Sequence, residues 1–137
     1  MKVKLIDKNC ILTKGHITDA GWDLKTRESK VLEPLEVYTL PVGVCVQLPK
    51  GFSGDVRPRS GLNSKGIVVL YGTADFGYTG EIKVTLINLS GKPYQINQYD
   101  RIAQLVINKI DNDANLEIVE ELSCSSRGAN GFGSTGR

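Results

Sequence analysis

Apolar and polar residues alternate along several stretches of this chain, and the alternation predicts β-strands. The clearest stretch is 82–87, where Ile82, Val84 and Leu86 occupy every second position. A period of two is expected of a strand with one buried face. A short apolar run covers 102–107, and β-branched segments bounded by Gly, Pro, Asn or Asp lie at 44–48, 67–70 and 116–119. We expect a strand at each.

Turn signals separate these strands, for example at 49–51 and 90–93. No sustained period of 3.6 residues is present, and the sequence predicts only one short helix, a turn or two after Ser60. Many short strands with Gly- and Pro-containing turns indicate an all-β fold, a barrel or jelly roll. Composition changes only near 123–127, so we expect a barrel domain over 1–126 and a separate C-terminal arm over 127–137.

Length and composition narrow the class of protein. A chain of 137 residues makes one domain with a real core. A net charge of +2 is too balanced to indicate nucleic-acid binding. No apolar run reaches membrane-spanning length, and the first ten residues lack the apolar stretch of a signal peptide, so a cytoplasmic protein is expected.

The cysteine and histidine content limits the chemistry further. Three widely spaced cysteines are typical of reduced thiols rather than of a metal cluster. The single histidine, His16, excludes di-histidine zinc sites and the zinc deaminase signature, and we also expect no His-based triad. A general base in this chain is therefore expected to be a carboxylate.

The arm has four glycines between 128 and 136 and no apolar period, so it cannot build a core and should be mobile in the free protein. It also carries two arginines, two hydroxyls and one aromatic, Phe132. Glycine amides and arginines suit a phosphate. Composition alone leaves two interpretations, a solubilising terminus and a segment that closes over an anion.

Two segments in the first half of the chain carry polar groups that a barrel does not need. In 20–24, Asp23 follows a glycine turn; it is either a solvated turn residue or a carboxylate holding hydrated Mg²⁺ beside phosphates. In 57–62, two arginines and Ser60 precede the expected helix. Ser60 is either its N-cap or, with Arg59, part of a phosphate site.

Two further segments lie in the second half. In 72–81, Asp75 is flanked by turn-forming glycines, and Tyr78 follows three residues later. The segment is either a simple hairpin turn or a general base at the mouth of a pocket with Tyr78 as its wall. The segment 101–105 looks like an ordinary strand carrying one polar residue, Gln104.

These four segments and the arm, in this order, resemble the five motifs of the trimeric dUTP pyrophosphatase (dUTPase) family. They read AGWDL, RPRSGL, GTADFGYTGE, RIAQL and RGANGFGSTG, and they span residue 20 to the C-terminus. The resemblance implies a jelly-roll homotrimer with three active sites, each built from all three subunits. It also implies conversion of dUTP and water to dUMP and pyrophosphate with Mg²⁺, which removes dUTP from the DNA precursor pool and supplies dUMP for thymidylate synthesis.

The resemblance also assigns roles to residues. Asp75 would orient and deprotonate the attacking water, and Tyr78 would pack under the deoxyribose and exclude a 2′-hydroxyl. Asp23 would hold Mg²⁺ through water. The uracil hairpin would comprise Val69, Gly72, Thr73, Ala74 and Lys83. Phosphates would be held by Arg59, Ser60, Gly61 and Gln104, and by Arg127, Gly133, Ser134 and Thr135 of the arm, with Phe132 over the uracil.

Two other functions remain open at this stage. A related deoxycytidine triphosphate deaminase shares the barrel, but that branch relies on a catalytic Glu in a different motif, whereas this chain keeps Asp75 and Tyr78. A binding or regulatory protein could retain the fold without catalysis, but the residues at all five motifs are intact. No nucleic-acid or membrane partner is expected.

Overall fold

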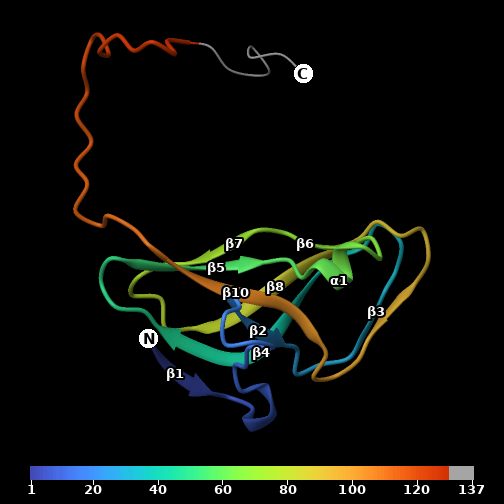
Figure 1. Ribbon diagram of the computed structural model, residues 1–137. Coiled ribbons are helices and arrows are strands. Elements are labelled where there is room, and N and C mark those ends of the chain that lie inside the picture. The colour runs from blue at the N-terminus through green and yellow to red at the C-terminus, as the bar shows by residue number, and fades with distance from the viewer. Residues whose placement is uncertain (130–137) are drawn as a thin grey trace.

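A computed structural model describes residues 1–129 of the chain (Figure 1). Strands dominate it, and the helical elements are one 3-10 turn, η1 (Lys8–Cys10), and one short helix, α1 (Ser60–Asn63). The strands are β1 (Lys2–Leu5), β2 (Gly21–Lys25), β3 (Lys30–Leu32), β4 (Val37–Gln47), β5 (Phe52–Arg57), β6 (Ile67–Val69), β7 (Gly72–Ala74), β8 (Glu81–Asn88), β9 (Tyr94–Ile96) and β10 (Arg101–Lys109).

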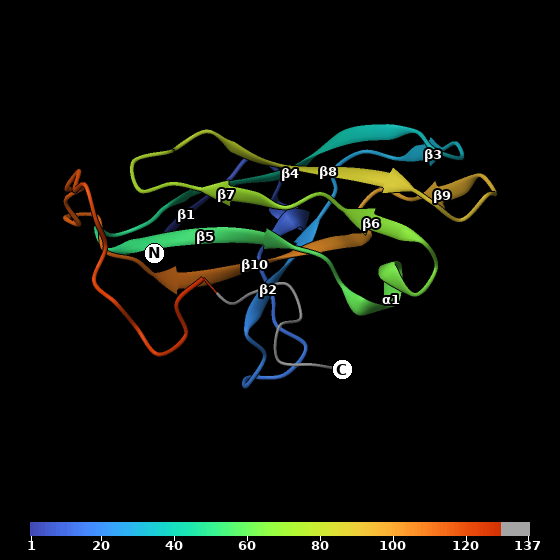
Figure 2. The same cartoon turned by 90° about the horizontal axis from the view of Figure 1, so that it is seen from above.

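The strands form two four-stranded sheets, with strand orders β1-β4-β8-β6 and β2-β10-β5-β7. A two-stranded sheet, β3-β9, extends from one end of the molecule (Figure 2). All strand pairs are antiparallel. The predicted all-β, jelly-roll-like fold is therefore confirmed.

The core lies between the two four-stranded sheets, because a single buried cluster takes side chains from both. Strand β8 shows how the pattern works: Ile82, Val84 and Leu86 are at most 3% exposed, whereas the residues between them are not buried. Leu24 of β2 and Leu105 of β10 pack against this face from the other sheet and are fully buried. Burying each such side chain stabilises the fold by about 1.5–3 kcal/mol.

The predicted short helix forms directly after the second motif segment, but its start differs from the expectation. Arg59 is the N-cap residue, with extended φ and ψ, and Ser60 is already the first helical residue. The N-cap interpretation of Ser60 is therefore wrong. Because no side chain caps α1, the hydroxyl of Ser60 is not used for capping.

The chain beyond β10 leaves the barrel, and Figure 1 shows this segment running clear of it. Residues 110–129 carry no strand, so the strand expected at 116–119 does not form within the described structure. Leu116 and Ile118 are 87% and 91% exposed. A strand needs a neighbour for its backbone hydrogen bonds, and this segment pairs with no strand among residues 1–129.

Candidate functional site

The third motif segment forms a hairpin-shaped turn that joins the two four-stranded sheets. It is not a simple β-hairpin, because β7 pairs with β5 while β8 pairs with β4 and β6; we call residues 72–83 the hairpin. Strand β7 ends at Ala74, Asp75 and Tyr78 lie in the turn, and β8 begins at Glu81. The turn closes through a hydrogen bond from the Tyr78 N–H to the Asp75 carbonyl, 3.1 Å. Gly77 adopts a φ of +91°, which side chains rarely allow, so glycine is required there. Asp75 and Tyr78 are both exposed.

A pocket of about 240 Å³ lies on this hairpin. Four predicted nucleoside-binding residues line it together with Tyr78: Gly72, Thr73, Ala74 and Lys83. Val69, in β6, is not among the lining residues. Val56 and Ile82 also line the pocket, and the sequence did not point to them, since apolar strand residues look alike whether they face a core or a pocket.

A second hollow, of about 380 Å³, gathers residues from the other motif segments. Asp23, Arg59, Ser60, Gly61 and Gln104 all line it. Their strands explain the gathering, because Gln104 of β10 lies opposite both Asp23 of β2 and Arg57 of β5. The sequence did not assign a role to four other residues around it, Gly15, Asp19, Gly21 and Arg101.

The charges in this hollow are tightly paired. Asp23 is buried, at 8% exposed, and each oxygen of its carboxylate contacts one arginine. Arg59 Nε lies 2.9 Å from Oδ1, and Arg101 Nη1 lies 3.2 Å from Oδ2. Arg59 also donates to the Arg101 carbonyl. Asp19 also lines the hollow, so its two carboxylates balance the two arginines. The guanidinium N–H groups of Arg59 and Arg101 nevertheless suit a phosphate, because arginine donors match its oxygens.

Two further contacts fix the floor of the hollow. The Gln104 side chain donates to the Pro58 carbonyl, 2.9 Å, so it is held toward the hollow rather than toward solvent. Gly21 lies against it, and any side chain at that position would collide with Gln104. Arg57, in contrast, does not line the hollow but pairs with Asp55, 2.8 Å.

The residues fit a metal that arrives with its ligand rather than one held by the protein alone. Among residues 1–129, no group of three or more His, Cys, Asp or Glu side chains could bind a metal ion directly. Asp23 is a single carboxylate, and Mg²⁺ typically keeps several waters and binds one or two carboxylates together with phosphates. A water-mediated role of Asp23 is compatible with this arrangement.

The hairpin pocket and the second hollow are far apart in one chain. Asp23 and Ala74 lie on β2 and β7, the outer strands of one sheet, which are three strand spacings or about 14 Å apart. The register adds three residues, about 10 Å along the strands, because Asp23 is level with Arg57 and Ala74 with Gly54. Asp75 therefore does not reach the second hollow of its own chain.

The arm is only partly described. Arg127 is exposed, and it lies in the segment beyond the barrel. The other predicted arm residues, Phe132, Gly133, Ser134 and Thr135, lie outside the described residues. Within residues 1–129, no helix has the length and apolar character needed to cross a membrane.

Comparison with known proteins agrees with this geometry. A family model described as dUTPase matches residues 7–136. The deoxyuridine 5'-triphosphate nucleotidohydrolase of Thermobifida fusca is 45% identical and covers 99% of this chain and 78% of its own length. The protein of the same name from Clostridioides difficile is 41% identical over 99% of this chain and 97% of its own.

Solved structures give the same result. The dUTPase of Staphylococcus bacteriophage 80alpha with dUPNHPP superimposes with a TM-score of 0.90 at 34% identity, covering 99% of this chain and 98% of its own. A mutant dUTPase from phage phi11 of S. aureus, for which coordination of a structural Mg(II) ion is described, has a TM-score of 0.81 at 32% identity, covering 90% and 98%. The chain belongs to the dUTPase family.

Proposed function

We propose that this chain hydrolyses dUTP to dUMP and pyrophosphate, removing dUTP from the DNA precursor pool and supplying dUMP for thymidylate synthesis. The observation that carries the proposal is the division of its polar residues between two places. One is the hairpin, which bears Asp75 and the pocket lined by Tyr78, and the other is the arginine-lined hollow around Asp23. The first suits a nucleoside and the second a triphosphate. We place the activity in the cytoplasm because the precursor pool is there.

Asp75 is proposed as the general base. Its exposed carboxylate accepts a proton from water, whose oxygen forms a bond to the α-phosphorus while the bond to the leaving pyrophosphate breaks. Little covalent chemistry is asked of the protein, and catalysis is mainly positioning and neutralisation of charge.

The hairpin pocket is proposed to select the nucleoside. Backbone groups around Gly72, Thr73 and Ala74, with Val69 and Lys83 nearby, face the uracil edge. The ring of Tyr78 packs under the deoxyribose and leaves no room for a 2′-hydroxyl. A hydroxyl forced against that ring loses hydrogen bonds with water at a cost of about 1–3 kcal/mol.

The arginine-lined hollow is proposed to hold the phosphates. Arg59, Ser60, Gly61 and Gln104 supply its donors, and charge-assisted hydrogen bonds from arginine bind phosphate oxygens strongly. Asp23 is the residue that would hold Mg²⁺, through water, and the ion would neutralise charge on the phosphates. Arg127, Gly133, Ser134 and Thr135 of the arm would close over the phosphates, with Phe132 over the uracil.

A homotrimer with shared sites is proposed because one chain does not bring its own half-sites together. The separation across the sheet keeps Asp75 away from the hollow of the same chain. Exposed Leu116, Ile118 and Leu122, each at least 87% exposed, also need a covering surface. A neighbouring copy supplies both, a complementary half-site and a cover for this segment.

The function is tested by incubating the full chain with Mg²⁺ and each deoxynucleoside triphosphate in turn, and with UTP. We expect pyrophosphate and dUMP from dUTP, and little product from the others. Formation of dUTP from dCTP would instead favour the related deaminase. Nucleotide binding without any turnover would favour a regulatory protein.

A further inference from the structure

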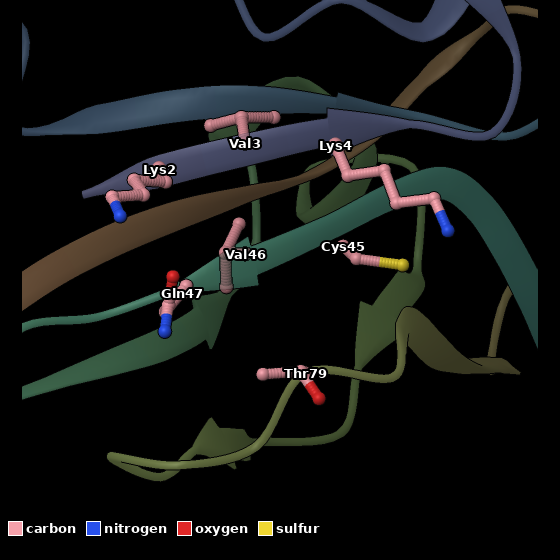
Figure 3. A pocket seen from close by; sticks show the side chains of 7 residues that line it. All are labelled: Lys2, Val3, Lys4, Cys45, Val46, Gln47 and Thr79. Carbon is pink, nitrogen blue, oxygen red and sulfur yellow. The ribbon is translucent and has the colours of Figure 1, made fainter.

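The tip of the catalytic hairpin receives little support from the core. Every residue from Asp75 to Thr79 is exposed, with Phe76 at 48% and Tyr78 at 46%. Behind the tip lies an open hollow of about 220 Å³, in which Thr79 lies across from Cys45 and Val46 of β4 (Figure 3). Packing therefore cannot fix the tip, and its position depends on the polar contacts at its base.

The ring of Tyr78 folds back onto that base. Its hydroxyl donates to the backbone carbonyl of Glu81, 2.9 Å. The ring lies so close over Gly80 that an added Cβ would sit 2.6 Å from the hydroxyl oxygen. The orientation of the ring is thus tied to the position of one residue, Glu81.

Glu81 is itself fastened to two other parts of the chain. Arg27 binds its carboxylate with two nitrogens, Nε at 2.8 Å from Oε1 and Nη2 at 3.2 Å from Oε2. Oε1 also accepts the Gly43 N–H, 2.9 Å. We call these contacts of Arg27, Glu81 and Gly43 the Glu81 clamp. Paired charge-assisted hydrogen bonds of this kind fix geometry as well as adding energy.

Both partners of Glu81 are anchored in the barrel. The N–H of Arg27 donates to the Pro41 carbonyl, and its own carbonyl accepts from Gln98. Gly43 lies where the β4–β8 register shifts, between Pro41 and Cys45, and its φ of +67° requires glycine. The Glu81 clamp therefore joins the free hairpin to the fixed part of β4.

We propose that Arg27 and Glu81 are positioning residues that set the discrimination between deoxyribose and ribose by holding the Tyr78 ring. The inference rests on the proposed function and deepens it. Neither side chain lines the nucleoside pocket, so both act only through the hairpin. Release of the clamp lets the ring move away and makes room for a 2′-hydroxyl.

The test compares kcat/KM for dUTP and UTP in Glu81→Gln and in the parent protein. Because misplacement by about 1 Å can cost a factor of about 10², we expect the dUTP-to-UTP ratio to fall by about 10- to 100-fold. Arg27→Lys, which keeps the charge but loses the two-nitrogen contact, should lower the ratio less. Amide hydrogen exchange at residues 75–81 should become faster in both variants.

Glu36→Gln is the matched control. Glu36 also pairs with a cation, Lys30 at 2.6 Å, and also accepts a backbone N–H, from Glu33, but it lies away from the hairpin. Glu36→Gln should leave the dUTP-to-UTP ratio and the amide hydrogen exchange of the hairpin unchanged. If Glu81→Gln keeps the dUTP-to-UTP ratio of the parent protein, the proposal is overturned, whatever the melting temperature of the variant. A parent protein that does not hydrolyse dUTP would instead contradict the proposed function.

Discussion

Asp75 shows how much depends on one side chain held at the end of a short strand. It follows Ala74, which is buried and only 4% exposed, so the backbone is fixed directly before the carboxylate projects into solvent. The described structure places no histidine near it, because His16 lies on the loop before β2. No other side chain on this hairpin turn can accept the proton of the water.

We expect Asp75→Asn to keep nucleotide binding and assembly while lowering turnover by about 10²- to 10⁴-fold, the usual contribution of a positioned general base. Turnover is measured as pyrophosphate release at saturating dUTP. Asp113→Asn, an exposed carboxylate in the segment after β10, is the control. Near-normal turnover in Asp75→Asn would place the base elsewhere.

At the scale of the element, β5 and β10 are joined by a polar cluster as well as by their backbones. Asp55 of β5 is 6% exposed and binds Arg57 at 2.8 Å, and Asn108 of β10 donates to the same carboxylate. Burial raises the pKa of Asp55, but hydrogen bonds from Arg57, Tyr71 and Asn108 outweigh it, so the pKa lies below its usual value. The cluster therefore favours the ionised form.

The Glu81 clamp likewise lowers the pKa of a carboxylate, that of Glu81. The hydrogen bond from Arg27 lowers the pKa of Glu81, burial opposes it, and the Gly43 amide lowers it further. For both carboxylates the unfolded chain binds protons more tightly than the folded one, so stability rises with pH in this range. The contribution is fully present above the unfolded values of about 4 and is lost as the pH falls through the folded values.

We therefore expect the melting temperature to decrease as the pH is lowered from about 5 to about 3. Asp55→Asn should be less stable at neutral pH and should show a smaller decrease over this interval, because one of the linked groups is gone. Asp113→Asn should follow the parent curve. A parent protein with a constant melting temperature over the interval would contradict the linkage.

At the scale of the whole molecule, we propose different roles for two parts of the chain after β10. Residues around Ile118 are proposed to bind a neighbouring subunit, and residues 127–137 are proposed to form an arm that closes over its phosphates. The boundary proposed at residue 126 can be tested by changing each part separately.

We expect Ile118→Asp to weaken the trimer, because a charge replaces an apolar side chain that the neighbour would bury. A lower mass by light scattering would show this.

Ending the chain at Ser126 should leave the trimer mass and melting temperature nearly unchanged while turnover falls severely, since Arg127 and the rest of the arm no longer neutralise the phosphates. Mass is measured by light scattering. A truncated protein that fails to assemble would make the arm a structural clasp, and one with full turnover would make it a solubilising terminus.

Local patterns determined much of the fold. Three predicted strands formed: β8 from its alternating pattern, β10 from its apolar run and β6 from its β-branched segment. Such strands can be predicted because the side chains that face the core are apolar and successive side chains point to opposite faces. The predicted short helix also formed, after Arg59, although none of its residues is buried. The motif segments also identified the family, since their residue types and order are properties of the sequence alone.

Contacts between distant residues were decided only by the tertiary structure. Arg27 and Glu81 are 54 positions apart, and nothing near either residue indicates the other. The pairing of Asp23 with both Arg59 and Arg101 likewise depends on how β2 and β10 are aligned. The segment 116–119 has the pattern of a strand but forms none, because a strand exists only where another backbone lies beside it, and that is a property of the folded assembly rather than of the segment.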